Sequence, residues 1–174
     1  MELNALLRTR RSCRSYKPDQ ITEEQLTALL EAAALAPTAM GRYDRIQLRV
    51  VQDPDLLEAI NADFAASIGN VNAYPTYHAP TVIFILTLRE DPPALRGANA
   101  AAVVENMTLA ATELGLGSVF LMGLTHELKD SAQANALLRI PAQFQMSAAM
   151  SVGYRTEAPE TREPDLSRIK TVRL

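Results

Sequence analysis

The strongest constraint on the architecture of this chain is the segment GANAAAVVENMTLAATELGLGS, residues 97–118. Its small and apolar side chains recur on almost every side of the helix that we expect over Gly97–Leu114. Gly115-Leu116-Gly117 then offers a glycine for a left-handed helix end. A helix that is apolar nearly all round has to be buried on most sides. In a chain of 174 residues, we expect a second subunit to supply part of that burial; the alternative is the core helix of a monomer.

Four segments around this helix predict the strands of a sheet. Thr81–Leu88 is a continuous apolar run, which is typical of a central strand buried on both faces. Ile46–Val51 alternates apolar and polar residues, and Ser118–Met122 and Gln145–Tyr154 follow the long helix. Two further helices are predicted over Glu2–Arg8 and Ser131–Leu138. Another begins with a capping box at Thr22 and Gln25 and ends before Pro37. A fourth begins at Asp53-Pro54, with Asp53 as its cap.

Composition limits the class of protein. The length is enough for one domain, 1–174, with a sizeable core. The net charge of −3 argues against nucleic acid as the main partner, because nucleic-acid domains usually carry a net basic surface. A single cysteine, Cys13, excludes an intrachain disulfide and favours a reducing, cytoplasmic location.

Targeting and metal signals are not expected. No apolar segment with a cleavage site follows Met1, so we expect no secretory signal. The longest apolar stretch carries too many polar residues to span a membrane. With two histidines, one cysteine and no cluster of the two, a dedicated zinc or copper site is not expected.

The segment Arg8–Pro18, RTRRSCRSYKP, gathers five cations and two serines near the start of an otherwise mildly acidic chain. Like charges this close repel one another unless a partner neutralises them. Two interpretations are open: a solvated basic patch, which is what most charge runs are, and a site for a bound anion. In the second, arginine forks and serine hydroxyls supply charge-assisted hydrogen bonds to a phosphate.

The sequence is poor in groups for acid–base catalysis. Neither His78 nor His126 lies in a nucleophile or metal motif, and no Walker or GxGxxG pattern occurs. Cys13 is interpreted as a small apolar plug behind the basic run, with a reactive thiol as the alternative. The loop Ala36–Asp44 either uses its small residues to approach a ligand closely or is a plain connector. This combination suits a protein whose bound cofactor carries the chemistry.

Several motifs in register resemble the FMN-dependent nitroreductase family. The block Arg10–Tyr16, followed by Leu29–Thr38, is similar to the family's opening, where Arg-Arg-Ser-x-Arg-x-aromatic precedes a helix that ends in Ala-Pro-Ser. Glu105–Ser118 resembles the family's central dimer helix with its Gly-Leu-Gly-Ser exit, and Ile140–Tyr154 resembles its last core strand. Order and spacing match over nearly the whole chain, which is identified as a short member of that family.

The resemblance implies an α+β fold, with a central sheet flanked by helices, in an intertwined homodimer. Two FMN molecules would lie at the subunit interface, and the tail 155–174 would pack on the partner. It also implies an oxidoreductase in which NAD(P)H reduces the flavin and the flavin reduces a nitroaromatic, a quinone or a similar acceptor by ping-pong. A non-catalytic protein that binds or delivers flavin is the alternative, and a phosphoanion-sensing module is a third hypothesis.

The resemblance also assigns the cofactor site residue by residue. Arg10 and Ser12 would hold the FMN phosphate, and Arg11 would lie along the ribityl chain. Arg14 would face the pyrimidine edge of the ring and tune it, because a fixed cation there stabilises the charge gained on reduction. The other subunit would contact the ring through Pro37, Thr38 and Ala39, with Met40 and Gly41 at the ring edge. The backbone of Met122 and Gly123 would also face the ring. Arg162 would contact the phosphate, and Tyr43 would contact the substrate.

Two places depart from the family pattern. The family's loop usually continues with Asn and then Gln-Pro-Trp, where this chain has Gly41, Tyr43, Asp44 and Arg45. A frequent basic residue two positions before Arg162 is Glu160 here. The chain is also short for the family, so we expect a more open substrate pocket.

Overall fold

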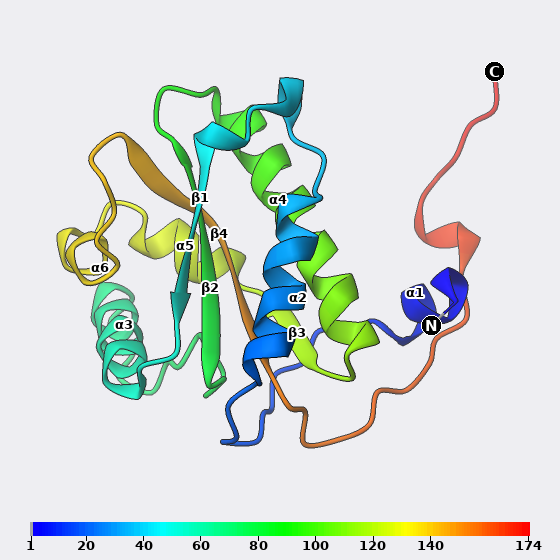
Figure 1. The fold of residues 1–174 in the computed structure, drawn as a ribbon, viewed down its shortest axis with the longest axis horizontal. Coiled ribbons are helices and arrows are strands. Elements are labelled where there is room, and N and C mark those ends of the chain that lie inside the picture. Colours follow the sequence, from blue (N-terminus) through cyan, green and yellow to red (C-terminus); the bar gives the residue numbers. More distant parts are fainter. Residues whose placement is uncertain (1) are drawn as a thin grey trace.

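One antiparallel sheet with helices on both faces organises the protein, as the computed structural model of residues 2–174 shows (Figure 1). The strands are β1 (Ile46–Val51), β2 (Thr81–Leu88), β3 (Gly117–Phe120) and β4 (Phe144–Gly153), in the sheet order β1-β2-β4-β3. The helices are α1 (Leu3–Thr9), α2 (Glu23–Ala34), α3 (Pro54–Ser67), α4 (Pro93–Glu113), α5 (Met122–Leu128) and α6 (Ala132–Leu137). Short 3-10 turns are η1 (Ala39–Gly41), η2 (Tyr43–Arg45) and η3 (Leu166–Arg168).

Strand β2 is buried on both faces, which confirms the prediction for Thr81–Leu88. It pairs antiparallel with β1 on one side and with β4 on the other. Because side chains alternate along a strand, Ile83 and Ile85 enter one core cluster with α2 and α4. Phe84 and Leu86 enter a second cluster with α3, α5 and α6. One apolar run therefore serves two core layers, which is why it shows no polar alternation.

Two helix starts are fixed by the local sequence. Thr22 accepts a hydrogen bond from the Gln25 N–H, and the Gln25 side chain accepts one from the Thr22 N–H, so the predicted capping box is confirmed. Asp53 caps α3 by accepting from the N–H groups of Asp55 and Leu56. Such caps satisfy N–H groups that have no partner within the helix.

The long helix begins earlier than the sequence analysis expected. Helix α4 starts at Pro93 rather than Gly97, because proline at the first helical position needs no N–H partner and already has a helical φ. Its end agrees with the prediction to within one residue, and Gly115 follows it with a φ of +75°. Met107 and Ala111 are fully buried within one chain, so the sheet and α2 already cover much of this helix.

The strand predicted over Ser118–Met122 is shorter than expected. Strand β3 ends two residues earlier, and Met122 begins α5 instead. Leu124 and Leu128, four residues apart on one helix face, are buried in the second core cluster. Burial of that face outweighs the weak helix signal of a segment that contains Gly123 and has no side-chain N-cap. Met122 and Gly123 therefore lie in the first turn of a helix.

Apolar surface on α1 and on the tail is left uncovered by this chain. Of the three leucines of α1, Leu6 is buried, whereas Leu3 and Leu7 are exposed. The tail 155–174 runs past α1 and away from the sheet (Figure 1). Its largest apolar side chains are exposed: Leu166, Ile169 and Val172. No helix within residues 2–174 is both long enough and apolar enough to cross a membrane.

Gly117, at the start of β3, has no room for a side chain. A Cβ there would lie 2.5 Å from Cys13 Sγ and 2.8 Å from Cys13 Cβ. We expect Gly117→Ala to lower the free energy of unfolding by about 1–3 kcal/mol through overpacking, as measured by chemical denaturation. Gly97→Ala is the control: a Cβ there meets nothing within 4 Å, so stability should rise by about 0.5–1 kcal/mol. Unchanged stability of Gly117→Ala would contradict the steric argument.

Candidate cofactor site

The basic run Arg8–Pro18 is held as an extended segment beside the sheet. Ser12 forms a bridge with Ser118 of β3, and Tyr16 forms one with Arg155, just after β4. Both halves of the run are thereby attached to the ends of core strands. Arg14 lies between these two bridges and is therefore presented on a fixed backbone.

One side of this segment faces the chain that follows β4. Ser15 Oγ and Thr156 Oγ1 lie 3.0 Å apart. Cys13, expected as a plug, is half-buried: its Sγ donates to the Ser15 carbonyl at 3.2 Å and lies against Gly117. A neighbouring hollow of about 370 Å³ is lined by residues 155–160 together with Arg11, Ser12 and Arg14. Three of the predicted cofactor residues therefore share one concave surface.

Arg10 and Arg162 lie near α1. Arg10 Nε is 3.6 Å from Glu105 Oε1 on α4, a loose ion pair with a half-exposed carboxylate. The Arg162 N–H donates to the Arg8 carbonyl at 3.1 Å, and Arg8 forms an ion pair with Glu163. Arg8, Arg162 and Glu163 line a groove of about 930 Å³ between α1 and the tail. The tail thus brings Arg162 beside the start of the basic run.

Arg14 reaches an aromatic ring that the sequence analysis did not single out. Its Cζ lies 5.9 Å from the centroid of the Tyr77 ring, within the range of a cation–π interaction. Tyr77 also lines a hollow of about 340 Å³ with Phe120, Met122 and Gly123. The structure therefore brings three of the predicted residues, Arg14, Met122 and Gly123, around one ring.

The loop Pro37–Gly41 lies near the start of α4, whereas Ser12 of the basic run pairs with β3, the strand that follows this helix. The Ala39 N–H donates to Asn99 Oδ1 at 3.1 Å, near the start of a helix that is about 30 Å long. Met40 has a φ of +56° and is 85% exposed. Thr38 Oγ1 is buried and has no hydrogen-bond partner within residues 2–174. The predicted site residues therefore fall into two groups, one beside the start of α4 and one beside β3.

Tyr43, the predicted substrate contact, lies on the outer side of this loop. Its hydroxyl donates to the Ala36 carbonyl at 3.2 Å, and its ring is half-exposed. The ring borders an apolar hollow of about 250 Å³ between α2, β1 and α4, which is also lined by Leu30, Leu48 and Val103. The hydroxyl is engaged within the loop, which leaves the ring as the exposed part of this side chain.

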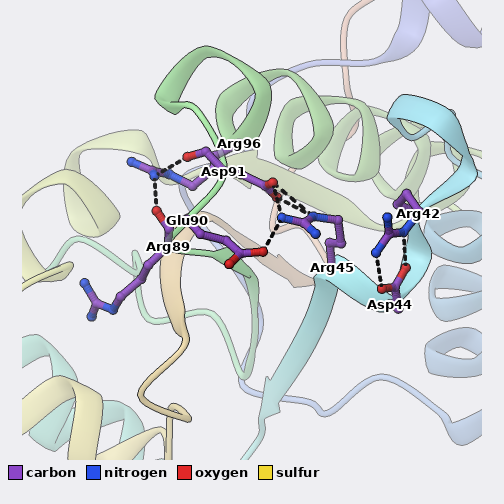
Figure 2. Close-up of polar contacts among 7 residues, drawn as sticks. All are labelled: Arg42, Asp44, Arg45, Arg89, Glu90, Asp91 and Arg96. Atoms are coloured by element: carbon purple, nitrogen blue, oxygen red, sulfur yellow. Dashed lines mark hydrogen bonds and ion pairs between the residues drawn. The ribbon is translucent and has the colours of Figure 1, made fainter.

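Figure 2 shows how charged side chains anchor the segment that departs from the family pattern. Arg45 Nε donates to both carboxylate oxygens of Asp91 at 3.0 Å, and its Nη2 donates to Glu90 at 2.8 Å. Arg42 binds the carboxylate of Asp44 through two hydrogen bonds of 3.0 Å. Arg45 thus ties η2 to the turn between β2 and α4. Part of the departure from the family pattern therefore serves to hold the loop in place.

Asp91 should make stability depend on pH. The hydrogen bonds from Arg45 hold the pKa of the Asp91 carboxyl below its ordinary value. Such a group stabilises the fold fully above its unfolded-state pKa of about 3.9, and the contribution is lost as the pH falls through the folded-state pKa. We expect Asp91→Asn to lower the thermal midpoint at neutral pH, with the difference from wild type shrinking as the pH falls below the unfolded-state pKa of about 3.9.

Thermal unfolding followed by circular dichroism across the acidic range measures this effect. Asp44→Asn is the matched control, because the Asp44 side chain is 63% exposed and exposed ion pairs contribute little. It should change the midpoint less than Asp91→Asn does. A difference between Asp91→Asn and wild type that stays constant across the acidic range would contradict the coupling to Arg45.

Two residues of this region received no role from sequence reasoning, Tyr77 and Glu105. Tyr77 lies in a loop, where no periodicity assigns a direction to a side chain. The available signal was the pair of tyrosines, Tyr74 and Tyr77, directly before the central strand. For Glu105 the signal was a carboxylate on an otherwise apolar helix, opposite in charge to the basic run.

The four-stranded antiparallel sheet, the long helix α4 and the basic run paired with β3 define a small α+β protein with a basic segment fixed beside its sheet. The chain belongs to the nitroreductase family, whose family model matches residues 7–73 and 66–154. The predicted family, and the predicted α+β fold with helices on both faces of a central sheet, are therefore confirmed.

Known relatives match along most of their length. A provisionally named NADH dehydrogenase/NAD(P)H nitroreductase of Archaeoglobus fulgidus is 32% identical over 162 residues, which cover 92% of this chain and 89% of the relative. A protein of the same provisional name from Methanothermobacter thermautotrophicus is 27% identical over 168 residues, covering 94% and 82%. Among solved structures, a nitroreductase with bound FMN from Bacteroides fragilis has a TM-score of 0.85 and 26% identity, covering 99% of this chain and 100% of that chain.

Proposed function

We propose that this chain is an FMN-dependent NAD(P)H oxidoreductase that works as a homodimer. Electrons pass from NAD(P)H through the cofactor to a nitroaromatic, a quinone or a similar acceptor, in a ping-pong sequence. The observation that carries the proposal is the basic run fixed beside the sheet in a chain of the nitroreductase family. Its Arg14 lies over the Tyr77 ring, which lines a hollow with Met122 and Gly123. The names of the two relatives point to the reductant, and the FMN of the Bacteroides fragilis structure points to the cofactor.

The residues present fit an FMN molecule. Its phosphate is an anion that Arg10, Ser12 and Arg162 can bind through charge-assisted hydrogen bonds, and all three are at least partly exposed. Thr38 Oγ1 is buried without a partner, so a polar group from a ligand or a second chain would satisfy it. FMN supplies two-electron chemistry that the side chains of this protein cannot supply.

Each group of residues then has one task. Arg10, Ser12 and Arg162 hold the phosphate, and Arg11 lies along the ribityl chain. Arg14 places a fixed positive charge at the pyrimidine edge, where negative charge develops on reduction. The first turn of α5 presents its backbone to the ring at Met122 and Gly123. The partner chain supplies the ring contacts Pro37, Thr38 and Ala39, the ring-edge residues Met40 and Gly41, and Tyr43 at the substrate.

The homodimer is part of the proposal because a single chain does not assemble this site. The loop Pro37–Gly41 is held near the start of α4, whereas Ser12 is held beside β3, which follows the end of that helix. Exposed apolar side chains on α1 and on the tail also need a covering surface: Leu3, Leu7, Leu166 and Ile169. In this dimer, residues 155–174, the tail of the single domain 1–174, pack on the neighbouring chain.

Two measurements on the purified protein test the function. FMN is added, and its visible spectrum is followed for the shift of a bound flavin; NAD(P)H oxidation is then followed with and without menadione, a quinone. We expect bound flavin and sustained oxidation that depends on the quinone. Bound flavin without sustained oxidation would favour a flavin carrier. FMN that stays free would contradict the proposal and favour a phosphoanion-sensing module.

A further inference from the structure

The loop before β2 contains two consecutive residues in the left-handed backbone conformation. Tyr77 and His78 both have a φ of +56°, and neither is glycine. This conformation is uncommon for such residues, and it persists only where the surrounding structure enforces it. Two strained residues in a row therefore indicate that the direction of the Tyr77 side chain is imposed by its surroundings.

Buried hydrogen bonds of Thr76, the residue before Tyr77, impose this conformation. The Thr76 N–H and Oγ1 both donate to Asn61 Oδ1, at 3.3 and 3.0 Å. The Thr76 carbonyl accepts from Ser151 Oγ at 2.8 Å. Thr76, Asn61 and Ser151 are all fully buried. On the other side, the His78 ring stacks on Tyr74 with centroids 3.6 Å apart. The loop is thus pinned on both sides of Tyr77.

The Tyr77 ring lies near Arg14, the arginine that the proposed function assigns to the flavin ring. Arg14 makes no ion pair within residues 2–174, and the Tyr77 ring, at 5.9 Å, is its aromatic neighbour. A long, exposed side chain with no other anchor loses its position readily, because fixing it costs rotamer entropy. The Tyr77 hydroxyl makes no hydrogen bond to the described residues, so the ring alone provides the contact.

We propose that Tyr77 is a positioning residue for Arg14, and that its ring sets how strongly the site favours reduced over oxidised FMN. The inference rests on the proposed function, since it needs bound FMN. A cation–π contact orients the guanidinium without neutralising its charge, as a carboxylate would. The full positive charge of Arg14 therefore remains available to the pyrimidine edge.

A double-mutant cycle on the FMN-loaded protein tests this role, with the two-electron potential of bound FMN as the readout. We expect Tyr77→Leu to weaken the binding of reduced relative to oxidised FMN about fivefold, which corresponds to a potential about 20 mV lower. In an Arg14→Ala background the same change should leave the potential unaltered, because the group that Tyr77 positions is gone. Tyr77→Phe keeps the ring and should restore the wild-type potential.

Each outcome decides the inference. An unchanged potential in Tyr77→Leu, or an equal shift with and without Arg14, would overturn it. Circular dichroism checks folding, and if Tyr77→Leu does not fold, Tyr77→Met, which also lacks a ring, takes its place. Failure of the unaltered protein to bind FMN would overturn the proposed function itself. The two failures are distinguishable, because in the first the wild-type potential is still measured.

Discussion

Arg14→Ala is expected to lower the two-electron potential of bound FMN by about 60 mV, which is a 100-fold change in the preference for reduced flavin. The variant removes a fixed positive charge from the edge where negative charge develops, and preorganised charges of this kind are among the largest catalytic effects. Reduction by NAD(P)H should slow about 100-fold in parallel. The Kd of oxidised FMN should rise less than tenfold, because Arg14 is not assigned to the phosphate. Redox titration and stopped-flow absorbance measure the two effects.

Arg14→Lys is the matched variant for this prediction. It keeps the charge but loses the planar guanidinium that lies over Tyr77. Its potential should therefore lie between those of wild type and Arg14→Ala, and nearer to wild type. A wild-type potential in Arg14→Ala, or a loss of FMN binding with no change in potential, would assign Arg14 a different role.

Arg10→Ala is expected to raise the Kd of FMN about 100-fold. Hydrogen bonds to a charged group contribute about 1.5–3 kcal/mol, and each 1.4 kcal/mol is about a tenfold change in affinity. The free energy of unfolding should change little, because the ion pair with Glu105 is loose at 3.6 Å and its carboxylate is half-exposed. Quenching of flavin fluorescence during titration measures the Kd.

Two controls separate phosphate binding from a general effect of charge. Riboflavin lacks the phosphate, so Arg10→Ala should change its affinity less than threefold, well under the effect on FMN. Lys17→Ala removes a cation from the same run at a position outside the proposed site, and the Kd of FMN should stay within about twofold. An equal loss of affinity for both flavins, or an equal loss in Lys17→Ala, would mean that Arg10 does not bind the phosphate.

Local sequence patterns predicted the core of the fold well. Thr81–Leu88 could be assigned because a central strand must be apolar on both faces, and Thr22 because a capping box is a local interaction. The start of α4 at Pro93 and the helix at Met122 were not predicted. At Pro93 the local signal was ambiguous, because a proline can precede a helix or begin it. At Met122 the helix signal was weak, and burial of Leu124 and Leu128 decided the outcome.

The candidate site was predicted as a set of residues but not as an arrangement. The basic run stood out by its charge, yet its position depends on the pairing of Ser12 with Ser118, which is far away in the sequence. Tyr77 was missed because its direction is imposed by Asn61 through Thr76, a contact that no periodicity reveals. The placement of Pro37–Gly41 near the start of α4, and of Ser12 beside β3, appears only in the folded chain.

Native mass spectrometry of the protein purified with FMN tests most directly whether two chains build the cofactor site together. The expected species has twice the 19.0 kDa mass of the chain and carries two FMN molecules. Chains separated by mild activation should lose the flavin at the same time as they lose their partner. A monomer that retains FMN, or a stable dimer that takes up none at saturating FMN, would contradict a site shared between two chains.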